Sequence, residues 1–518
     1  MLLDDRDRSL EPGADEGARA VKLCVVLTEA TTAAMAARMA ELAPLADLFE
    51  VRADYVRDLD LEALLRARTR PILLTCRVES EGGRFPDAGA RERQELLLRA
   101  ARLGFELVDV EARAGFSEVV AARKRGGLVL SWHDLVGTPD DLEAVYARMA
   151  AERPEIVKIV VTARSIRDLG RLVSFAARHA QGPGPRLLAL AMGPHGVASR
   201  VLGGRFGAPF TFASAEAGRE SAPGQLAARA LDSVYRVRSI GPRTRVYGLL
   251  GSDVLRSLSP TIQNRAFRER GLDAVYVPLQ AESLAAFMEA LPALGLSGFS
   301  VTRPYKGEIL ERLDSVTPNA AASGSANTVV VQDGRLVGMS TDGDGVLLPL
   351  RRRLDPAGRQ VAILGAGGAA RAAAFALVRA GARVTLAARR AEQAREVAAA
   401  TGCDACALED VARLEYDVLV NATPLGSGAY PGETPLPRRL LRAGSVVFDM
   451  VYEPRETPLI RAARALGCAT IDGVEMLVAQ AVGQFEAWTG EAAPVEAMTD
   501  AATAAIEDVR SVEMGAAS

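Results

Sequence analysis

Lysine is rare in this chain, because only four of its 62 Lys and Arg residues are lysines. One of them, Lys158, lies in the apolar run EIVKIVV, which predicts a buried strand where a charged amine resists leaving water. A guanidinium cannot act as a neutral amine nucleophile, so a lysine placed here indicates chemistry through its amine. Lys306, in SVTRPYKGEIL, raises the same question.

Further polar side chains interrupt neighbouring apolar runs. With the lysine they are Glu50, Arg52, Asp54, Arg77, Glu111, His133 and Lys158. Structural ion pairs inside a barrel would account for any one of them taken alone, but not readily for the whole set. We expect His133 and Lys158 to lie at equivalent heights on adjacent strands, within reach of one substrate.

The elements that must position these residues are short β-rich runs, each followed by a segment of helical length. They are residues 22–28, 48–54, 71–77, 106–113, 128–134, 155–161, 186–192 and 209–214. Eight such units are typical of a (β/α)8 TIM barrel, whose chemistry lies at the carboxyl ends of the strands. We therefore predict an α/β fold that begins with this barrel.

The pattern breaks at a Gly-Pro within residues 236–245, where we place a domain boundary. Three further strands and a hairpin turning at Asp333-Gly334 predict a substrate lobe. A second series begins at Arg359 with RQVAILGAGGAAR and continues through ARVTLAARR, DVLVNATP, SVVFDMVY and CATIDG. This series predicts a Rossmann lobe.

The glycine pattern of the second series predicts a dinucleotide site. Gly365-x-Gly367-x-x-Ala370 stands between a strand and a helix, where glycines admit a pyrophosphate to the helix N-terminus. The next strand ends in Arg389 and Arg390, where an NAD enzyme has an acid, so we predict NADP. The alternative is that these are two more arginines in an arginine-rich chain.

Lys306 and Asp342 come from separate elements and are candidates for passing a proton to a carbonyl that is being reduced. The alternative is a surface lysine and a helix-capping aspartate.

Composition narrows the class of function. A net charge of -3 without a basic stripe argues against nucleic acid or a membrane as partner and favours small molecules. No apolar run reaches membrane-spanning length, and the acidic N-terminus lacks signal-peptide features, so we expect a cytoplasmic protein with a disordered tail at residues 1–20. Cys403 and Cys406 form a C-x-x-C without a second ligand pair, so we expect no metal there.

Two family resemblances cover nearly the whole chain. Residues 21–238 resemble type I 3-dehydroquinate dehydratases in FEVRAD, CRVESEGG, SWHDL, VKIVV, AMGPHGVASR and SAPGQ. Residues from 243 to about 515 resemble shikimate dehydrogenases in SLSPTIQNRAF, SVTRPYK, SANT, STD, GAGGAAR, AARR, NATPLG and MLVAQA. This order is similar to that of fused bifunctional enzymes of the shikimate pathway. It implies a substrate lobe at 243–345, an NADP lobe at 346–475 and a helical segment at 476–518 returning to the substrate lobe.

In the first half, the resemblance implies that Lys158 forms a Schiff base with the ketone of 3-dehydroquinate. His133 would remove the adjacent proton and then assist the loss of water. The implied substrate pocket, with Arg200 as the carboxylate clamp, consists of Glu50, Arg52, Arg77, Glu81, Arg200, Ser221 and Gln225. Imine formation needs a neutral amine, which burial and neighbouring cations favour.

In the second half, the resemblance implies that Lys306 and Asp342 are the catalytic pair for reducing 3-dehydroshikimate to shikimate with NADPH. The implied substrate-binding residues are Ser257, Ser259, Asn327 and Gln480. The implied cofactor-binding residues are Gly365, Gly367, Gly368, Ala370, Arg389, Arg390 and Thr423. Departures from the family pattern leave open whether quinate or NAD is also used; they are Arg256, Gln263, Ser300, Ser340, Ala388 and Ser427.

Two other interpretations are weighed against this one. A Schiff-base aldolase barrel joined to another NADP oxidoreductase conflicts with the SWHDL and SAPGQ segments. A catalytically inactive half serving as a scaffold conflicts with the intact Lys158/His133 and Lys306/Asp342 pairs. The oligomeric state stays open.

Overall fold

The computed structural model describes residues 20–115, 117–122, 127–180 and 182–516. The tail predicted at residues 1–20 lies outside the described residues except for Ala20. The chain divides into two compact units, Met1–Thr244 and Arg245–Ser518. Each unit is described by itself.

The first unit contains all eight predicted strands. They are β1 (Lys22–Leu27), β2 (Leu48–Arg52), β3 (Ile72–Thr75), β4 (Leu107–Glu111), β5 (Gly127–His133), β6 (Ile156–Thr162), β7 (Arg186–Met192) and β8 (Phe210–Ser214). All pair in parallel in the order β7-β6-β5-β4-β3-β2-β1-β8, and short β9 (Leu226–Ala227) follows β8. The sheet curls enough for the Lys158 amine on β6 to lie 4.4 Å from the Phe212 ring centre on β8. This confirms the predicted barrel.

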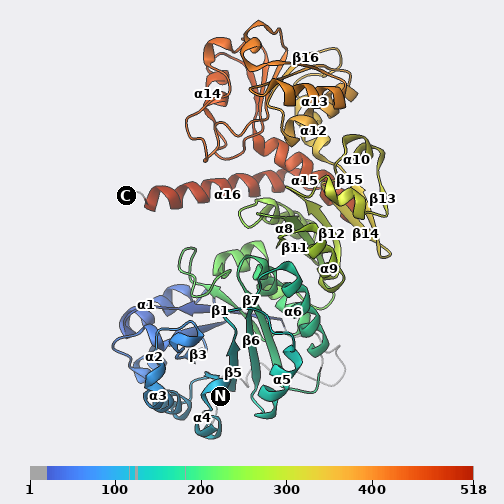
Figure 1. Cartoon of the computed structure of the whole chain (residues 1–518). Helices are drawn as coiled ribbons and strands as arrows, with labels where there is room; N and C mark the ends of the chain where they lie inside the picture. The colour runs from blue at the N-terminus through green and yellow to red at the C-terminus, as the bar shows by residue number, and fades with distance from the viewer. Residues whose placement is uncertain (1–19, 116, 123–126, 181, 517–518) are drawn as a thin grey trace. The chain divides into compact units, whose positions relative to one another are not determined.

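Helices follow the strands and lie outside them (Figure 1). They are α1 (Thr32–Leu42), α2 (Leu61–Ala67), α3 (Ala90–Leu103), α4 (Ser117–Ala122), α5 (Leu142–Ala151), α6 (Ile166–His179) and α7 (Val197–Leu202). Side-chain caps fix several starts; the Asp141 carboxylate accepts from Ala144 N, and Ser165 forms a capping box with Asp168.

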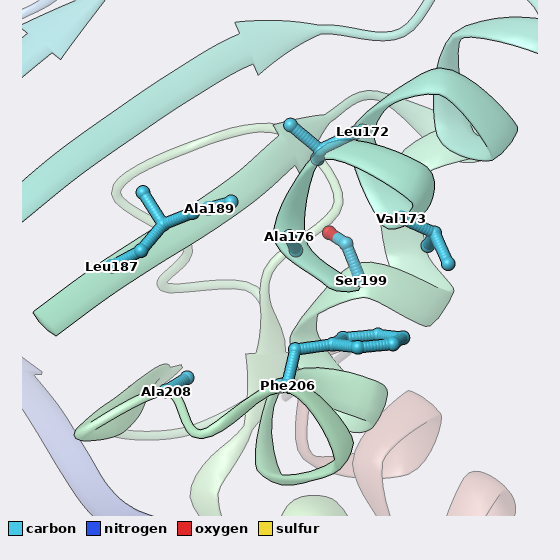
Figure 2. Close-up of a pocket in the computed structure, with 9 residues that line it drawn as sticks. Leu172, Val173, Ala176, Leu187, Ala189, Ser199, Phe206 and Ala208 are labelled. Atoms are coloured by element: carbon cyan, nitrogen blue, oxygen red, sulfur yellow. The ribbon is translucent and has the colours of Figure 1, made fainter. Parts of the chain in front are cut away.

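A small pocket in the barrel wall lies between α6, β7 and α7 (Figure 2). Its lining is apolar apart from Ser199, whose Oγ donates to Gly196 O at 2.7 Å and accepts from Ala191 N at 2.9 Å. The one polar side chain is therefore satisfied by backbone, so this pocket is a packing space and offers no reactive group.

The second unit begins with a six-stranded sheet. Its strands are β10 (Arg245–Gly251), β11 (Ala274–Gln280), β12 (Leu296–Val301), β13 (Ser315–Val316), β14 (Thr328–Gln332) and β15 (Arg335–Met339). Their order is β11-β10-β12-β14-β15-β13. Asp333 and Gly334 both have positive φ, 50° and 76°, as a tight two-residue hairpin turn requires. The predicted hairpin is therefore confirmed. Helices α8 (Ser259–Glu269), α9 (Leu284–Leu294) and α10 (Pro318–Ser323) belong to this part.

A second, fully parallel sheet forms the predicted Rossmann lobe. Its strands are β16 (Gln360–Leu364), β17 (Arg383–Ala388), β18 (Asp404–Ala407), β19 (Val418–Asn421), β20 (Val446–Asp449) and β21 (Ala469–Ile471), in the order β18-β17-β16-β19-β20-β21. Its helices are α11 (Asp342–Arg351), α12 (Gly368–Arg379), α13 (Ala391–Thr401) and α14 (Pro458–Arg464). The strand order reverses between β16 and β19, and open parallel sheets bind their ligands at the carboxyl ends of the strands at such a point.

Two C-terminal helices return to the first sheet of the second unit. They are α15 (Gly473–Thr489) and α16 (Val495–Ala516), and both pack on α8. Phe485 and Trp488 join the core that holds Tyr247 and Phe267, and Trp488 Nε1 donates to Val329 O at 3.0 Å. Helix α15 therefore joins the two lobes. Across the described part of the chain, no helix is both long and apolar enough to span a bilayer.

Candidate active sites

The residues predicted for the first site converge on one cavity. It lies at the carboxyl ends of the barrel strands. The predicted residues that line it are Glu50, Arg52, Arg77, Glu81, His133, Lys158, Arg200, Ser221 and Gln225. Asp54 and Glu111 are not among the described residues that line the cavity. Asp54 forms an ion pair with Arg52 at 2.7 Å, and Glu111 forms one with Arg77 at 3.1 Å. For these two acids the structural interpretation is therefore sufficient.

Lys158 is buried at the floor of this cavity, with 5% of its surface exposed. Its amine lies 3.1 Å from Asp109 Oδ2 and 3.7 Å from Glu50 Oε1. The nearest charged groups are thus carboxylates, and the expected neighbouring cations, Arg52, Arg77 and Arg200, line the same cavity. Carboxylates at this distance can accept a proton or a hydrogen bond from the amine.

Asp109 is a site residue that the sequence reasoning missed. Its Oδ1 accepts from Arg77 Nη2 at 2.8 Å and from Ser131 Oγ at 2.6 Å. Burial by itself raises the pKa of Asp109, but the charges of Arg77 and Lys158 outweigh it and bring the pKa down to about 2. The alternation in LVDVE, which puts Asp109 and Glu111 on one face of β4, was the signal that could have found it.

His133 lies one layer above Lys158. The strand register pairs Lys158 with Ser131 and His133 with Val160, so the expectation of equivalent heights is wrong by two residues. Both side chains still line the same cavity, because residues two apart on a strand face the same side.

The imidazole of His133 is prepared to act as a base. Its Nδ1 lies 2.9 Å from Glu81 Oε2. Burial, and then the positive charges of Arg77 and Lys158, hold the pKa of His133 well below its usual range. Burial also raises the pKa of Glu81, to about 7. A neutral imidazole that donates from Nδ1 to a carboxylate keeps a free lone pair on Nε2.

Arg200 is a buried cation with spare donors. Only 2% of its surface is exposed, its Nε has no hydrogen-bond partner, and Nη2 donates to Pro223 O at 3.4 Å. Burial lowers its pKa to about 10, which still leaves it charged at neutral pH. A buried guanidinium with an unpaired donor fits the carboxylate of a bound substrate.

The second site forms around the Asp342 carboxylate at the start of α11. Lys306 Nζ donates to its two oxygens at 2.9 and 2.7 Å, and Asn327 Nδ2 donates to Oδ1 at 2.9 Å. The N-cap of α11 is Thr341, so Asp342 does not serve as a helix cap. Lys306 is 31% exposed whereas the acid is buried, so the amine faces outward from the pair.

The remaining predicted substrate residues of this unit lie on neighbouring elements. Gln480 on α15 is joined to the site through its backbone oxygen, which accepts from Thr341 Oγ1 at 3.0 Å. Ser257 and Ser259 contact each other, Oγ to Oγ at 3.1 Å, at the start of α8. Helix α8 in turn contacts α15, where Gln263 Nε2 donates to Ala481 O at 3.0 Å.

The glycine loop of the Rossmann lobe fits a dinucleotide. Gly365 has φ of 115°, and an added Cβ would lie 3.1 Å from Ala422 O. Above Gly367 and Gly368 there is open space, since a Cβ on either meets nothing within 4 Å. Ala370 is fully buried and packs α12 on the sheet. The exposed backbone at the N-terminus of α12 can therefore receive a pyrophosphate.

The other predicted cofactor residues lie at the same edge of the sheet. Arg389 and Arg390 follow β17 and are exposed. Thr423 follows β19, and its N and Oγ1 both donate to Asn421 Oδ1, at 2.9 and 2.7 Å. Two exposed guanidiniums at this position match a 2′-phosphate and leave no acid for free ribose hydroxyls.

Models of known families match successive parts of the chain. Residues 23–242 match type I 3-dehydroquinase, and residues 249–329 match the shikimate dehydrogenase substrate-binding domain. Residues 360–427 match the NADP oxidoreductase, coenzyme F420-dependent model, and residues 473–503 match the shikimate 5'-dehydrogenase C-terminal domain.

Individual proteins match over longer stretches. The chloroplastic bifunctional 3-dehydroquinate dehydratase/shikimate dehydrogenase of Arabidopsis thaliana is 36% identical, over 87% of this chain and 79% of that protein. The shikimate dehydrogenase (NADP(+)) of Pyrococcus abyssi is 40% identical, over 49% of this chain and 96% of that protein. Among solved structures, the dehydroquinate dehydratase and shikimate dehydrogenase of S. pombe AroM is 25% identical, covers 94% of this chain and 98% of that chain, and has a TM-score of 0.44.

Proposed function

Because the chain belongs to the bifunctional 3-dehydroquinate dehydratase/shikimate dehydrogenase family, we propose that Lys158 and Lys306 are the reacting amines of its two activities. The protein is a shikimate-pathway enzyme that dehydrates 3-dehydroquinate and reduces the product with NADPH. The observation that carries the residue assignment is the convergence of all nine predicted side chains on one cavity with the buried lysine at its floor. We assign dehydration to residues 21–238 and reduction to lobes at 243–345 and 346–475, with the helical segment 476–518 completing the first lobe.

Dehydration begins at the Lys158 amine. Its nitrogen adds to the ketone carbon, and the carbonyl oxygen leaves as water to give an iminium. Asp109 accepts the amine hydrogen bond and stays ionised, so it orients the nitrogen towards the ketone carbon. The iminium draws electrons from the adjacent carbon, whose proton His133 Nε2 removes and then returns to the departing hydroxyl.

We predict that dehydratase kcat/KM falls as the pH drops through about 7, the pKa of Glu81. Below that pH Glu81 is protonated and donates its O–H to His133 Nδ1, which puts the imidazole hydrogen on Nε2, so the basic Nε2 lone pair is lost. In Glu81→Gln the amide oxygen accepts at every pH. The acid limb should therefore disappear, with a plateau lower by up to about 10²-fold.

The measurement is kcat/KM for 3-dehydroquinate from pH 5 to 9 in both proteins. Glu79→Gln removes an exposed carboxylate two residues away and should keep the wild-type profile. A limb near pH 7 that persists in Glu81→Gln would show that another group titrates there.

Reduction is arranged around the Lys306–Asp342 pair. NADPH supplies the hydride when bound. The Lys306 side chain donates a proton or a hydrogen bond to the oxygen that becomes the alkoxide, and Asp342 holds the amine in position through two hydrogen bonds. We assign the substrate carboxylate to Ser257 and Ser259, and the substrate hydroxyls to Asn327 and Gln480.

Replacing both Arg389 and Arg390 by alanine should change the cofactor preference. We expect the KM for NADPH to rise roughly tenfold to hundredfold, because one or two charge-assisted contacts to the 2′-phosphate are lost. The KM for NADH should change less than about threefold, since NADH lacks that phosphate. Steady-state kinetics with each cofactor measure this.

Arg383→Ala is the matched control for the arginine variant, because Arg383 is an exposed arginine at the opposite end of the same strand. It should leave both KM values unchanged. An equal rise for NADPH and NADH in the double variant would contradict a phosphate-binding role.

One assay tests the two activities together. Purified protein is mixed with NADPH and either 3-dehydroquinate or 3-dehydroshikimate, and the loss of NADPH absorbance is followed. Oxidation with both substrates is expected. Oxidation with 3-dehydroshikimate alone would mean that the barrel is inactive, and the assignment of Lys158 would be wrong.

A further inference from the structure

The loop of residues 215–225, which joins β8 to β9, carries two of the proposed substrate-binding residues. Ser221 donates from N and Oγ to Gln225 Oε1, at 2.9 and 3.2 Å. Pro223 O accepts from Arg200 Nη2 at 3.4 Å. These contacts hold the second half of the β8–β9 loop against the cavity wall, but they do not hold its first half.

The first half is held by a ring of four charged side chains. Glu216 and Arg219 come from the loop, Glu29 follows β1, and Arg38 lies on α1. Arg38 bonds Glu216, and Arg219 lies 3.7 Å from Glu216 and 3.6 Å from Glu29. Arg38 Nε lies 3.9 Å from Glu29 Oε1, which closes the ring. Opposite charges alternate around it, so every neighbouring pair attracts.

The ring ties an exposed segment to a buried one. The side chains of Arg38 and Glu29 are mostly buried, whereas those of Glu216 and Arg219 are about half exposed. Isolated surface ion pairs contribute little, but charges shared among several partners form a network. The inner pair belongs to the end of β1 and to α1, which are fixed parts of the barrel.

We propose that this ring positions the β8–β9 loop over the dehydratase cavity, and that Glu216 and Arg219 are positioning residues for Ser221 and Gln225. The inference rests on the proposed function of that cavity. The four residues of the ring are not among the described residues that line the cavity. The ring therefore acts on the substrate only through the position of the loop. Weakening it therefore raises KM and leaves the chemistry at Lys158 unchanged.

Glu216→Gln tests the proposal, because Glu216 is shared by both arginines. Arg38 keeps Glu41 at 2.6 Å and Arg219 keeps Glu29, so the change strands no buried charge. We expect KM for 3-dehydroquinate to rise roughly threefold to tenfold with kcat within about twofold. The wild-type KM should approach that of the variant between ~0.1 M and ~1 M salt, where the Debye length falls from about 10 to about 3 Å.

Two further variants separate the ring from general charge effects. Glu220→Gln makes the same charge change on the same loop, where Glu220 accepts only from Gly218 N in the contacts described, and it should leave KM unchanged. Glu216→Asp keeps the charge and should retain most of the wild-type affinity. The proposal would be overturned if Glu216→Gln and the wild type had equal KM values. It would also be overturned if the KM values of both proteins rose by the same factor with salt. A wild-type protein without dehydratase activity would instead overturn the proposed function.

Discussion

Lys158→Ala is expected to lose dehydratase activity by about 10⁴- to 10⁶-fold in kcat and to keep full reduction of supplied 3-dehydroshikimate. Loss of a covalent nucleophile removes the reaction path itself, which is why the effect is so large. The second activity should survive because Lys158 lies inside the first compact unit, 5% exposed among its own barrel strands. The NADPH assay with each substrate measures both effects.

The covalent step has its own readout. Borohydride reduces an iminium to a stable amine, so wild-type protein treated with 3-dehydroquinate and borohydride should gain one substrate-derived mass on the peptide that contains Lys158. Lys124→Ala is the lysine control and should trap the substrate like wild type, while Lys158→Ala should not. Mass on another lysine, or loss of both activities in Lys158→Ala, would contradict the assignment.

Periodicity was enough to predict the barrel, because the eight buried parallel strands have the pattern of short apolar runs. Strands β1 to β7 are neighbours in chain order, and β8 pairs with β1. The same reasoning found Lys158 and His133, which interrupt such runs. It missed Asp109, although the alternation in LVDVE puts Asp109 on the same face of the strand as the candidate Glu111. Only the sheet register places Asp109 between Arg77 and the amine.

Contacts between residues far apart in the chain were beyond the sequence. Gln263 and Ser300, both departures from the family pattern, donate hydrogen bonds to the same residue. Gln484 Oε1 accepts from Gln263 Nε2 at 3.3 Å and from Ser300 Oγ at 2.9 Å. The Tyr276 hydroxyl donates a hydrogen bond to Ser300 Oγ at 2.8 Å. No periodic pattern links residues separated by 221 positions, because such a contact depends on how α8 and α15 pack. The charge ring around Glu216 escaped prediction for the same reason.

Lys306→Ala is the complementary experiment. We expect reduction of 3-dehydroshikimate to lose about 10²- to 10⁴-fold in kcat, the usual contribution of a positioned proton donor. The substrate KM should change much less, because the residues proposed to hold the substrate, Asn327, Gln480 and the two serines, are unchanged. Dehydration should be unaffected, since Lys306 belongs to the second unit. Kinetics with 3-dehydroshikimate and NADPH, and separately the dehydration rate without NADPH, measure these outcomes.

Asp342→Asn distinguishes the two members of the pair. The carboxylate is 6% exposed and accepts from both Lys306 and Asn327, so an amide in its place keeps the size but not the charge that holds the ammonium. We expect a smaller loss of kcat than in Lys306→Ala, because the amine is still present but less well directed. A double variant no worse than Lys306→Ala alone would show that Asp342 acts through the lysine, whereas additive losses would show that the acid contacts the substrate independently.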